Sequence, residues 1–234
     1  MHLFYAPDLE LGSVAVLPPE ESHHAIRVLR LGSGSGLTVV DGKGGWFSAR
    51  ILDPNPRACQ VELLECQPGT GQPGYTLHLA IAPTKQIDRI EWLVEKATEI
   101  GITEITPLLC HHSERREVKT ERLLKVTVSA MKQSLKAWHP AINPMVRFDR
   151  FLDASRGDSG FIAHCQAGEK KWLDRPLFGK DPIVILIGPE GDFSEAEIQL
   201  ARESGFREIT LGNSRLRTET AGIVAVQTVA WLMR

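Results

Sequence analysis

The sequence lacks the features that identify several common classes of protein. Its four cysteines form no CxxC pair and stand near no histidines at zinc-finger spacing, so we expect reduced thiols and no metal site. No apolar stretch reaches the roughly 18 residues of a membrane-spanning helix. The first residues, Met1 to Pro7, show no basic region before an apolar core. We therefore expect a cytoplasmic protein.

Neither sign of charge dominates, since 27 Lys and Arg stand against 29 Asp and Glu. RNA binding nevertheless needs only a local basic surface. Between His111 and Lys136 there are seven basic and three acidic residues, a pattern typical of an ordinary solvated helix face or of a phosphate contact. The candidate RNA contacts here are Arg116, Lys132 and Lys136.

A second basic pair, Arg27 and Arg30, lies in a helix predicted from about residue 20 to 31, after Pro18-Pro19 and before Gly32. Residues three apart share a helical face, so these two arginines are further candidates for contact with RNA. The adjacent His23 and His24 would point in different directions on that helix, which disfavours a shared metal ion.

The two common nucleotide-binding motifs, GxGxxG and GxxxxGK[ST], are also absent. The sequence has instead two glycine turns, each following an apolar run. Residues 183–187 are a continuous β-branched segment typical of a strand buried on both faces, and they stop at Gly188-Pro189-Glu190-Gly191. Residues 208–211 stop at Gly212. Two such turns predict one crevice beyond the strand ends, and backbone amides with small residues suit a ligand such as S-adenosylmethionine.

The pattern along the chain predicts two domains, covering residues 1–70 and 75–234. Residues 1–66 show short strands at 2–5, 37–41, 46–52 and 58–64, with a hairpin signal at Asp41 to Gly45, and predict a small β-barrel. Residues 67–74, rich in Gly and Pro, form the expected linker. The remainder alternates as an α/β domain, with strands at 76–82, 104–109, 160–164, 183–187 and 208–211 and helices at 87–100, 120–136, 194–204 and 218–233.

Two charged residues, Arg217 and Glu219, stand at the start of the last, apolar helix. Burial of that helix would draw both into a partly desolvated place. A structural ion pair is one interpretation. The other is that Arg217 stabilises negative charge that develops on a substrate, while Glu219 orients the substrate or a base.

Taken together, the motifs resemble those of the bacterial 16S ribosomal RNA uridine N3-methyltransferases, which belong to the SPOUT class. The resemblance spans essentially the whole chain. Its most specific parts are the two glycine turns, the second reading Leu211-Gly212-x-x-x-Leu216-Arg217-x-Glu219-Thr220-Ala221. The other matching segments are His24-x-x-Arg27-Val28-Leu29-Arg30-Leu31, Asp41-Gly42, Lys96 to Gly101, Ser113-Glu114-Arg115 and Gln133-Ser134.

The resemblance implies a PUA-like barrel followed by a domain with a C-terminal trefoil knot, a homodimer with active sites at the subunit interface, and 16S ribosomal RNA or the small ribosomal subunit as partner. Arg217, Glu219 and Arg115 would be catalytic. The residues implied to bind S-adenosylmethionine are Ile187, Gly188, Pro189, Glu190, Gly191, Leu211, Gly212, Leu216, Thr218, Thr220 and Ala221.

Two positions depart from the family pattern. Asp192 stands where the family usually has a second glycine, which puts the backbone geometry there in question. Leu135-Lys136 replaces a Gly-Arg pair, and Lys136 would substitute for an arginine contact with looser geometry. These departures motivate one alternative, an RNA-binding dimer without catalytic activity. A second alternative is a SPOUT methyltransferase that acts on transfer RNA, which the pocket motifs alone do not exclude and only the amino-terminal match disfavours.

Overall fold

The computed structural model describes residues 2–68, 71–155, 159–179 and 182–234. It divides into two compact units. The first contains residues 1–72 together with 128–139, and the second contains residues 73–127 together with 140–234.

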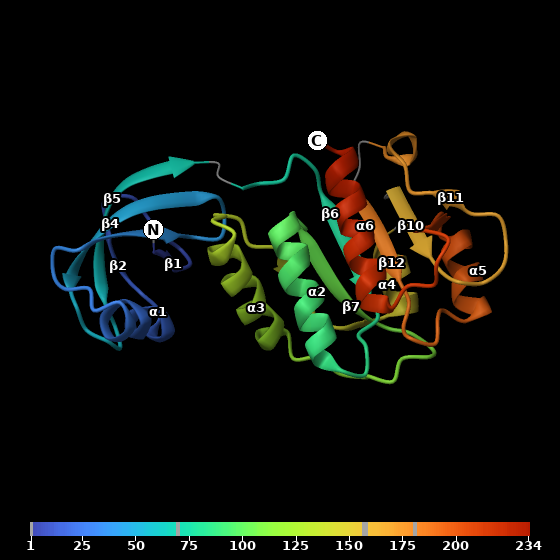
Figure 1. Cartoon of the computed structure of the whole chain (residues 1–234), viewed down its shortest axis with the longest axis horizontal. Coiled ribbons are helices and arrows are strands. Elements are labelled where there is room, and N and C mark those ends of the chain that lie inside the picture. The colour runs from blue at the N-terminus through green and yellow to red at the C-terminus, as the bar shows by residue number, and fades with distance from the viewer. Residues whose placement is uncertain (1, 69–70, 156–158, 180–181) are drawn as a thin grey trace. The chain divides into compact units, whose positions relative to one another are not determined.

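The first unit is built on a curved five-stranded sheet in the order β1-β3-β4-β5-β2 (Figure 1). In the described part of the chain, β1 and β2 are its two edges, so the expected β-structure is confirmed as a half-barrel. The predicted hairpin joins β3 to β4, and the Asp41 carboxylate accepts the N–H groups of Lys43 and Gly45 at 2.7 and 2.9 Å. The strands are β1 (Leu3–Tyr5), β2 (Val14–Val16), β3 (Gly36–Val40), β4 (Gly45–Asp53) and β5 (Gln60–Pro68).

The helix predicted over residues 20–31 is shorter and less regular than expected. It consists of α1 (Pro19–His23) followed by a π-helical turn, η1 (His24–Val28). Arg30 lies beyond it with a φ of +55°. The prediction that Arg27 and Arg30 share a helical face is therefore wrong, because a π turn and a left-handed residue break the 3.6-residue spacing. Both side chains are exposed.

Residues 128–139 complete the first unit, although they are distant in sequence from its strands. Met131 and Ala137 are buried against Leu3 and Val40. The His139 N–H donates to the Gly42 carbonyl at 3.0 Å. The boundary predicted from the linker gave no sign of this segment, because local composition does not record contacts between distant residues.

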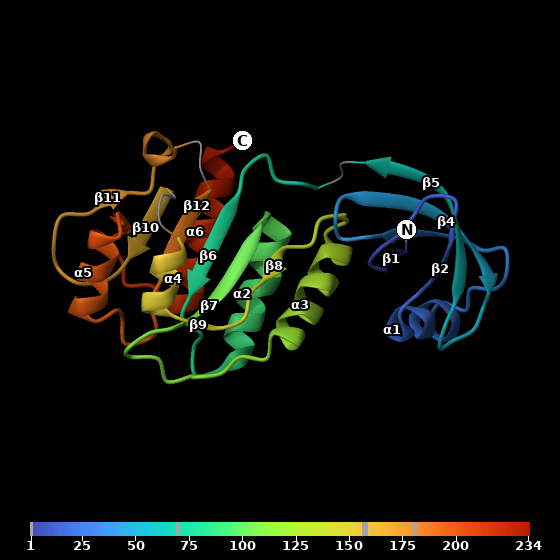
Figure 2. The ribbon, with the colours of Figure 1, turned by 180° about the vertical axis from the view of Figure 1, so that it is seen from behind.

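The second unit is a parallel sheet in the order β11-β13-β10-β12-β6-β7-β8, with β9 also pairing to β7 (Figure 2). The five strands expected from the sequence are present as β6 (Leu77–Ile81), β7 (Glu104–Leu109), β10 (Ser159–Ala163), β12 (Ile183–Ile187) and β13 (Arg207–Thr210). Five short elements were not predicted: the two-residue strands β8 (Ala141–Ile142), β9 (Val146–Arg147) and β11 (Lys171–Trp172), the helix α4 (Phe148–Ala154) and the 3-10 turn η2 (Arg175–Leu177).

Helices cover both faces of this sheet (Figures 1 and 2). On one face α2 (Ile87–Ile100) packs against α6 (Thr218–Leu232), and on the other lie α4 and α5 (Glu195–Glu203). The helix predicted over residues 120–136 is α3 (Thr120–Gln133). Strand β12 shows why its sequence is uniformly apolar: Ile183, Ile185 and Ile187 enter the core beneath α2 and α6, whereas Val184 and Leu186 enter the core beneath α4 and α5.

Helix α6 approaches the sheet closely at Gly222. A Cβ atom there would lie 3.1 Å from Ile81 Cδ1 on β6 and 2.4 Å from Leu93 Cδ1 on α2, so a larger residue would require these side chains to shift. The trefoil knot implied by the resemblance stays a prediction. None of the helices formed by the described residues is long and apolar enough to cross a membrane.

Candidate functional site

A cavity of about 790 Å³ opens in the second unit, where β10, β12 and β13 end. This is the edge at which parallel α/β sheets bind ligands, and the volume falls within the range of small-molecule sites. Its walls come from the chain leaving each strand and from the first turn of α2. The lining residues are Arg89, Ala163, His164, Cys165, Lys170, Ile187, Gly188, Pro189, Glu190, Asp192, Ile209, Thr210, Leu211, Gly212, Asn213, Ser214, Arg215, Leu216, Arg217, Thr218 and Ala221.

The structure brings together most of the residues predicted to bind the cofactor. Two of the predicted set, Gly191 and Thr220, are not among the lining residues. Gly191 packs instead against His112, because a Cβ atom added to Gly191 would lie 3.1 Å from the His112 Cβ. The nine that line the cavity are Ile187, Gly188, Pro189, Glu190, Leu211, Gly212, Leu216, Thr218 and Ala221.

The turn after β12 is held in place by its neighbours. A Cβ at Gly188 would lie 3.0 Å from the Phe193 ring, so the turn closes tightly over that buried side chain. Helix α5 begins with a capping box, in which the Ser194 side chain accepts the Glu197 N–H and the Glu197 side chain accepts the Ser194 N–H. The buried Thr218 hydroxyl donates to the Gly188 carbonyl at 3.1 Å. That bond joins the two predicted cofactor loops.

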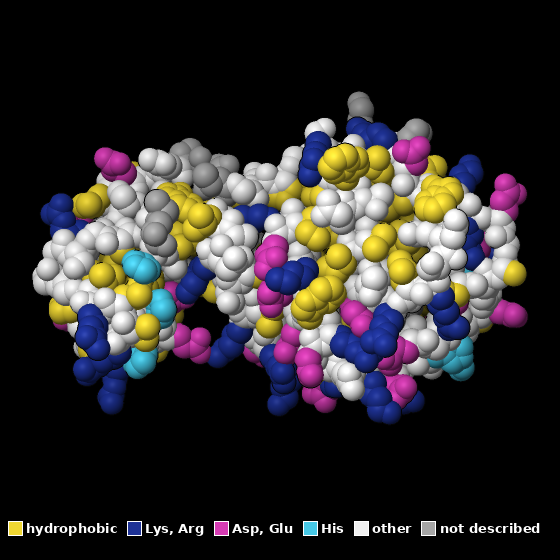
Figure 3. Space-filling model, in the orientation of Figure 1, with side chains coloured by type: hydrophobic (Ala, Val, Ile, Leu, Met, Phe, Trp, Pro, Cys, Tyr) yellow, Lys and Arg dark blue, Asp and Glu magenta, His cyan; other side chains and the backbone are white. Residues whose placement is uncertain are grey.

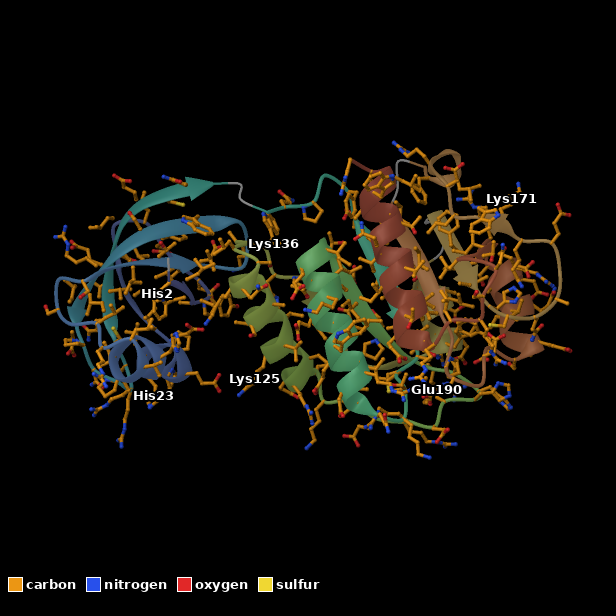
Figure 4. All side chains as sticks on the ribbon, viewed as in Figure 1. His2, His23, Lys125, Lys136, Lys171 and Glu190 are labelled. Atoms are coloured by element: carbon orange, nitrogen blue, oxygen red, sulfur yellow. The ribbon has the colours of Figure 1, made fainter. Side chains whose placement is uncertain are left out.

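Arg89 contributes a second link between these loops, which the sequence analysis did not assign to the site. Its guanidinium lies 3.4 Å from the Glu190 carboxylate and 3.8 Å from that of Glu219. Glu190 lies at the end of the sheet where α6 begins (Figure 4). A signal was available, because Arg89 follows the predicted strand 76–82 and the chain leaving that strand reaches the same sheet edge.

The three predicted catalytic residues occupy different places. Arg217 lines the cavity at the N-cap position of α6, and within the described residues its exposed guanidinium has no hydrogen-bond or ion-pair partner. Glu219 lies behind the rim with its side chain 10% exposed, and its Oε2 is buried without a partner among those same residues. Arg115 is outside the lining, where its Nε donates to the Thr84 carbonyl at 3.1 Å.

The predicted RNA contacts are divided between the two units. Arg27 and Arg30 are exposed on the first unit, and Arg116 is exposed on the second. Lys132 is instead ion-paired with the buried Glu21 at 2.5 Å. Lys136 is half-buried, and its stem lies against Gly71.

A polar network around a buried histidine links β13 to the chain that follows β10. The side chain of His164 is fully buried and its Nε2 is 2.7 Å from Glu208 Oε2. Arg202 donates to both oxygens of Glu208. Burial lowers the pKa of His164, and the Arg202 hydrogen bonds lower the pKa of Glu208. We therefore assign a neutral imidazole that donates Nε2–H to an ionised carboxylate.

Both positions that depart from the family pattern have left-handed backbone. Asp192 has a φ of +64° and Leu135 a φ of +53°. Asp192 accommodates this conformation and uses its carboxylate to accept two main-chain N–H groups. Among the described residues, no group of three or more His, Cys, Asp or Glu side chains is arranged to hold a metal ion.

Comparison with known proteins agrees with this geometry. The family model of an RNA methyltransferase domain matches residues 72–230, and that of an RNA methyltransferase PUA domain matches residues 17–64. The ribosomal RNA small subunit methyltransferase E of Rickettsia conorii is 33% identical over 218 residues, covering 90% of this chain and 86% of the relative.

Two solved structures extend the likeness to the fold. A probable rRNA-methyltransferase from Porphyromonas gingivalis superposes with a TM-score of 0.90 at 39% identity, covering 100% of this chain and 98% of the other. The ribosomal RNA small subunit methyltransferase E of Neisseria gonorrhoeae, solved with S-adenosyl methionine bound, gives 0.84 at 28% identity over 99% and 98%. The chain therefore belongs to the ribosomal RNA small subunit methyltransferase E family, whose members are RNA methyltransferases with a PUA domain.

Proposed function

We propose that this protein transfers a methyl group from S-adenosylmethionine to N3 of a uridine in the 16S ribosomal RNA of the small subunit. The observation that carries the proposal is the cavity at the strand ends, because the two loops predicted to bind the cofactor meet there. Family membership supports the class of substrate, and a ribosomal RNA substrate places the protein's action in the cytoplasm.

The cavity suits the cofactor in size and chemistry. Its volume of about 790 Å³ leaves room for a nucleoside with an amino-acid chain, and for the target base beside it. The turns Ile187 to Glu190 and Leu211 to Gly212 would hold it by main-chain groups, with Leu216 and Ala221 packing around it. When bound, the cofactor supplies an electrophilic methyl group on a positively charged sulfur.

Residues of the chain would activate the uracil that accepts the methyl group. Uracil N3 reacts only after it loses its proton, which leaves negative charge largely on O2 and O4. The guanidinium of Arg217, which has no partner among the described residues, would donate hydrogen bonds to that charge. Glu219, whose Oε2 is buried behind the rim, would orient the group that accepts the N3 proton, and Arg89 lies 3.8 Å from its other oxygen. Because N3 lies on the Watson–Crick edge, the uridine must be unpaired or flipped out.

The geometry of Arg115 favours a supporting role over direct contact with the base. Its guanidinium donates to the carbonyl oxygens of Thr84 and Lys85, in the loop before α2. The Lys85 N–H donates in turn to Glu190 at 3.4 Å. Arg115 thus holds the loop that supports one wall of the cavity.

The partner surfaces follow from exposed side chains on each unit. Arg27 and Arg30 on the first unit and Arg116 on the second would contact RNA phosphates. Hydrophobic side chains gather over α2 and α6 (Figure 3), where Trp92 is 47% and Trp231 63% exposed. Aromatic side chains this exposed are enriched at protein interfaces, so we place the homodimer contact on this face.

The test compares Arg217→Ala with Arg215→Ala, since both arginines line the cavity and are exposed. Each protein is incubated with small ribosomal subunits that lack the modification, and N3-methyluridine is quantified by mass spectrometry. Loss of one charge-stabilising donor should lower the rate by about 10²- to 10³-fold in Arg217→Ala. Cofactor affinity, measured by calorimetry, should change little. Equal rates for the two variants would remove Arg217 from the mechanism, and failure of the wild type to bind S-adenosylmethionine would refute the function.

A further inference from the structure

Two neighbouring strands contribute adjacent walls of the cavity. Strands β10 and β12 pair in parallel, with Ala163 opposite Ile187 at their carboxyl ends. The chain leaving β10 supplies Ala163, His164 and Cys165 to the lining, and the chain leaving β12 supplies residues 187–190 and Asp192. Sheet hydrogen bonds end with the strands, so beyond them another interaction must set the spacing of the two walls.

Asp192 supplies such an interaction, beside a longer bond from the Gln166 Nε2–H to the Phe193 carbonyl at 3.4 Å. Its Oδ2 accepts the Cys165 N–H at 2.8 Å, and its Oδ1 accepts the Phe193 N–H at 2.9 Å. The first bond crosses from the β12 turn to the chain after β10, and the second fixes the carboxylate on its own turn. The Asp192 carbonyl accepts a further bond from His112 Nδ1 at 3.0 Å. Asp192 is thus bonded on three sides.

The residue type matches the backbone as well as the contacts. Asp192 has a φ of +64°, a conformation that Asp and Asn adopt more readily than most residues. A glycine would adopt it without strain but would leave both N–H groups without this acceptor. An asparagine would keep the conformation but has a single acceptor oxygen for two N–H donors.

We propose that Asp192 is a positioning residue that holds the two walls of the cavity at the spacing that binds S-adenosylmethionine. The proposal rests on the function proposed above. Hydrogen bonds from main-chain N–H groups to a carboxylate are among the stronger ones in proteins. They fix the walls before the cofactor arrives, so the cofactor does not bear the cost of ordering them.

The experiment measures cofactor affinity and local opening in Asp192→Gly and Asp192→Asn. Asp8→Gly is the matched control, because Asp8 is also an aspartate with positive φ, +57°, but belongs to the first unit. Calorimetry gives the Kd for S-adenosylmethionine, thermal unfolding gives Tm, and amide hydrogen exchange reports the Cys165 and Phe193 N–H groups. We expect the Kd to rise about tenfold in Asp192→Gly, which is about 1.4 kcal/mol, and by less in Asp192→Asn.

Amide exchange at Cys165 should be faster in both Asp192 variants, while the control keeps wild-type affinity and exchange. A purely structural role would lower Tm without this effect on Kd. An unchanged Kd in a folded Asp192→Gly protein would overturn the proposal, whether or not the amides exchange faster. Failure of the wild type to bind S-adenosylmethionine would instead refute the proposed function, which separates the two conclusions.

Discussion

The hydrogen bond from Thr218 to Gly188 offers a direct test of how the two cofactor loops are held together. In Thr218→Val the shape of the side chain is kept, but the Gly188 carbonyl loses a partner at a buried position. Leaving a buried acceptor unpaired costs about 1–3 kcal/mol. For a domain of this size, a loss of 1.5 kcal/mol lowers Tm by about 3–6 °C. Thermal unfolding followed by circular dichroism measures the change, and calorimetry should show weaker binding of S-adenosylmethionine.

Thr228→Val is the matched control on the same helix. Its hydroxyl donates to the Val224 carbonyl one turn earlier at 2.8 Å, a bond within α6 itself. This variant should keep wild-type cofactor affinity and lose little stability. If Thr218→Val matched Thr228→Val in both Tm and Kd, the loops would be held by something other than this bond.

Two further predictions concern stability. Burial lowers the pKa of His164 below its ordinary 6.5. On acidification the unfolded chain therefore takes up this proton at a higher pH than the folded chain does. The free energy of unfolding then decreases as the pH drops below about 6.5, by at most about 1.4 kcal/mol per pH unit. Arg202 lowers the pKa of Glu208, so Glu208 adds to the loss of stability at lower pH. In His164→Gln, the free energy of unfolding measured in urea should depend less on pH between pH 7 and 5. An unchanged slope of that free energy against pH would contradict the assignment of a neutral His164. Leu135→Gly should relieve the strain of left-handed backbone and stabilise the fold by about 0.5–1 kcal/mol. The control Leu124→Gly, within α3, should destabilise the fold by about 1 kcal/mol. If urea unfolding showed a change of the same sign in the free energy of unfolding of both variants, the strain argument would be refuted.

Much of the second unit could be predicted because its signals are local. A strand buried on both faces must be apolar throughout, and residues 183–187 meet that condition. Ser194 and Glu197 are three residues apart, the spacing that a capping box requires. The nine predicted residues around the cavity could be identified for a similar reason, since they lie at the ends of β12 and β13 or in the chain that follows these strands.

The helix after Pro18-Pro19 shows where local reasoning failed. Its start was predicted correctly, but the π turn at residues 24–28 and the positive φ of Arg30 changed the direction of the side chains that follow. Neither feature has a composition signal, since arginine has no preference for left-handed backbone. Packing within the first unit, where Ala25 is fully buried, decides the local geometry instead.

The sequence by itself therefore determined the strands, the main helices, the two loops that meet at the cavity and the resemblance to a methyltransferase family, because periodicity and short motifs encode them. Only the tertiary structure decided which distant residues meet. Arg89 lies between Glu190 and Glu219, Asp192 bonds Cys165, and residues 128–139 join the first unit. These contacts join residues between 27 and 130 positions apart, and such pairing arises from the folded arrangement of strands and helices, which no local pattern records.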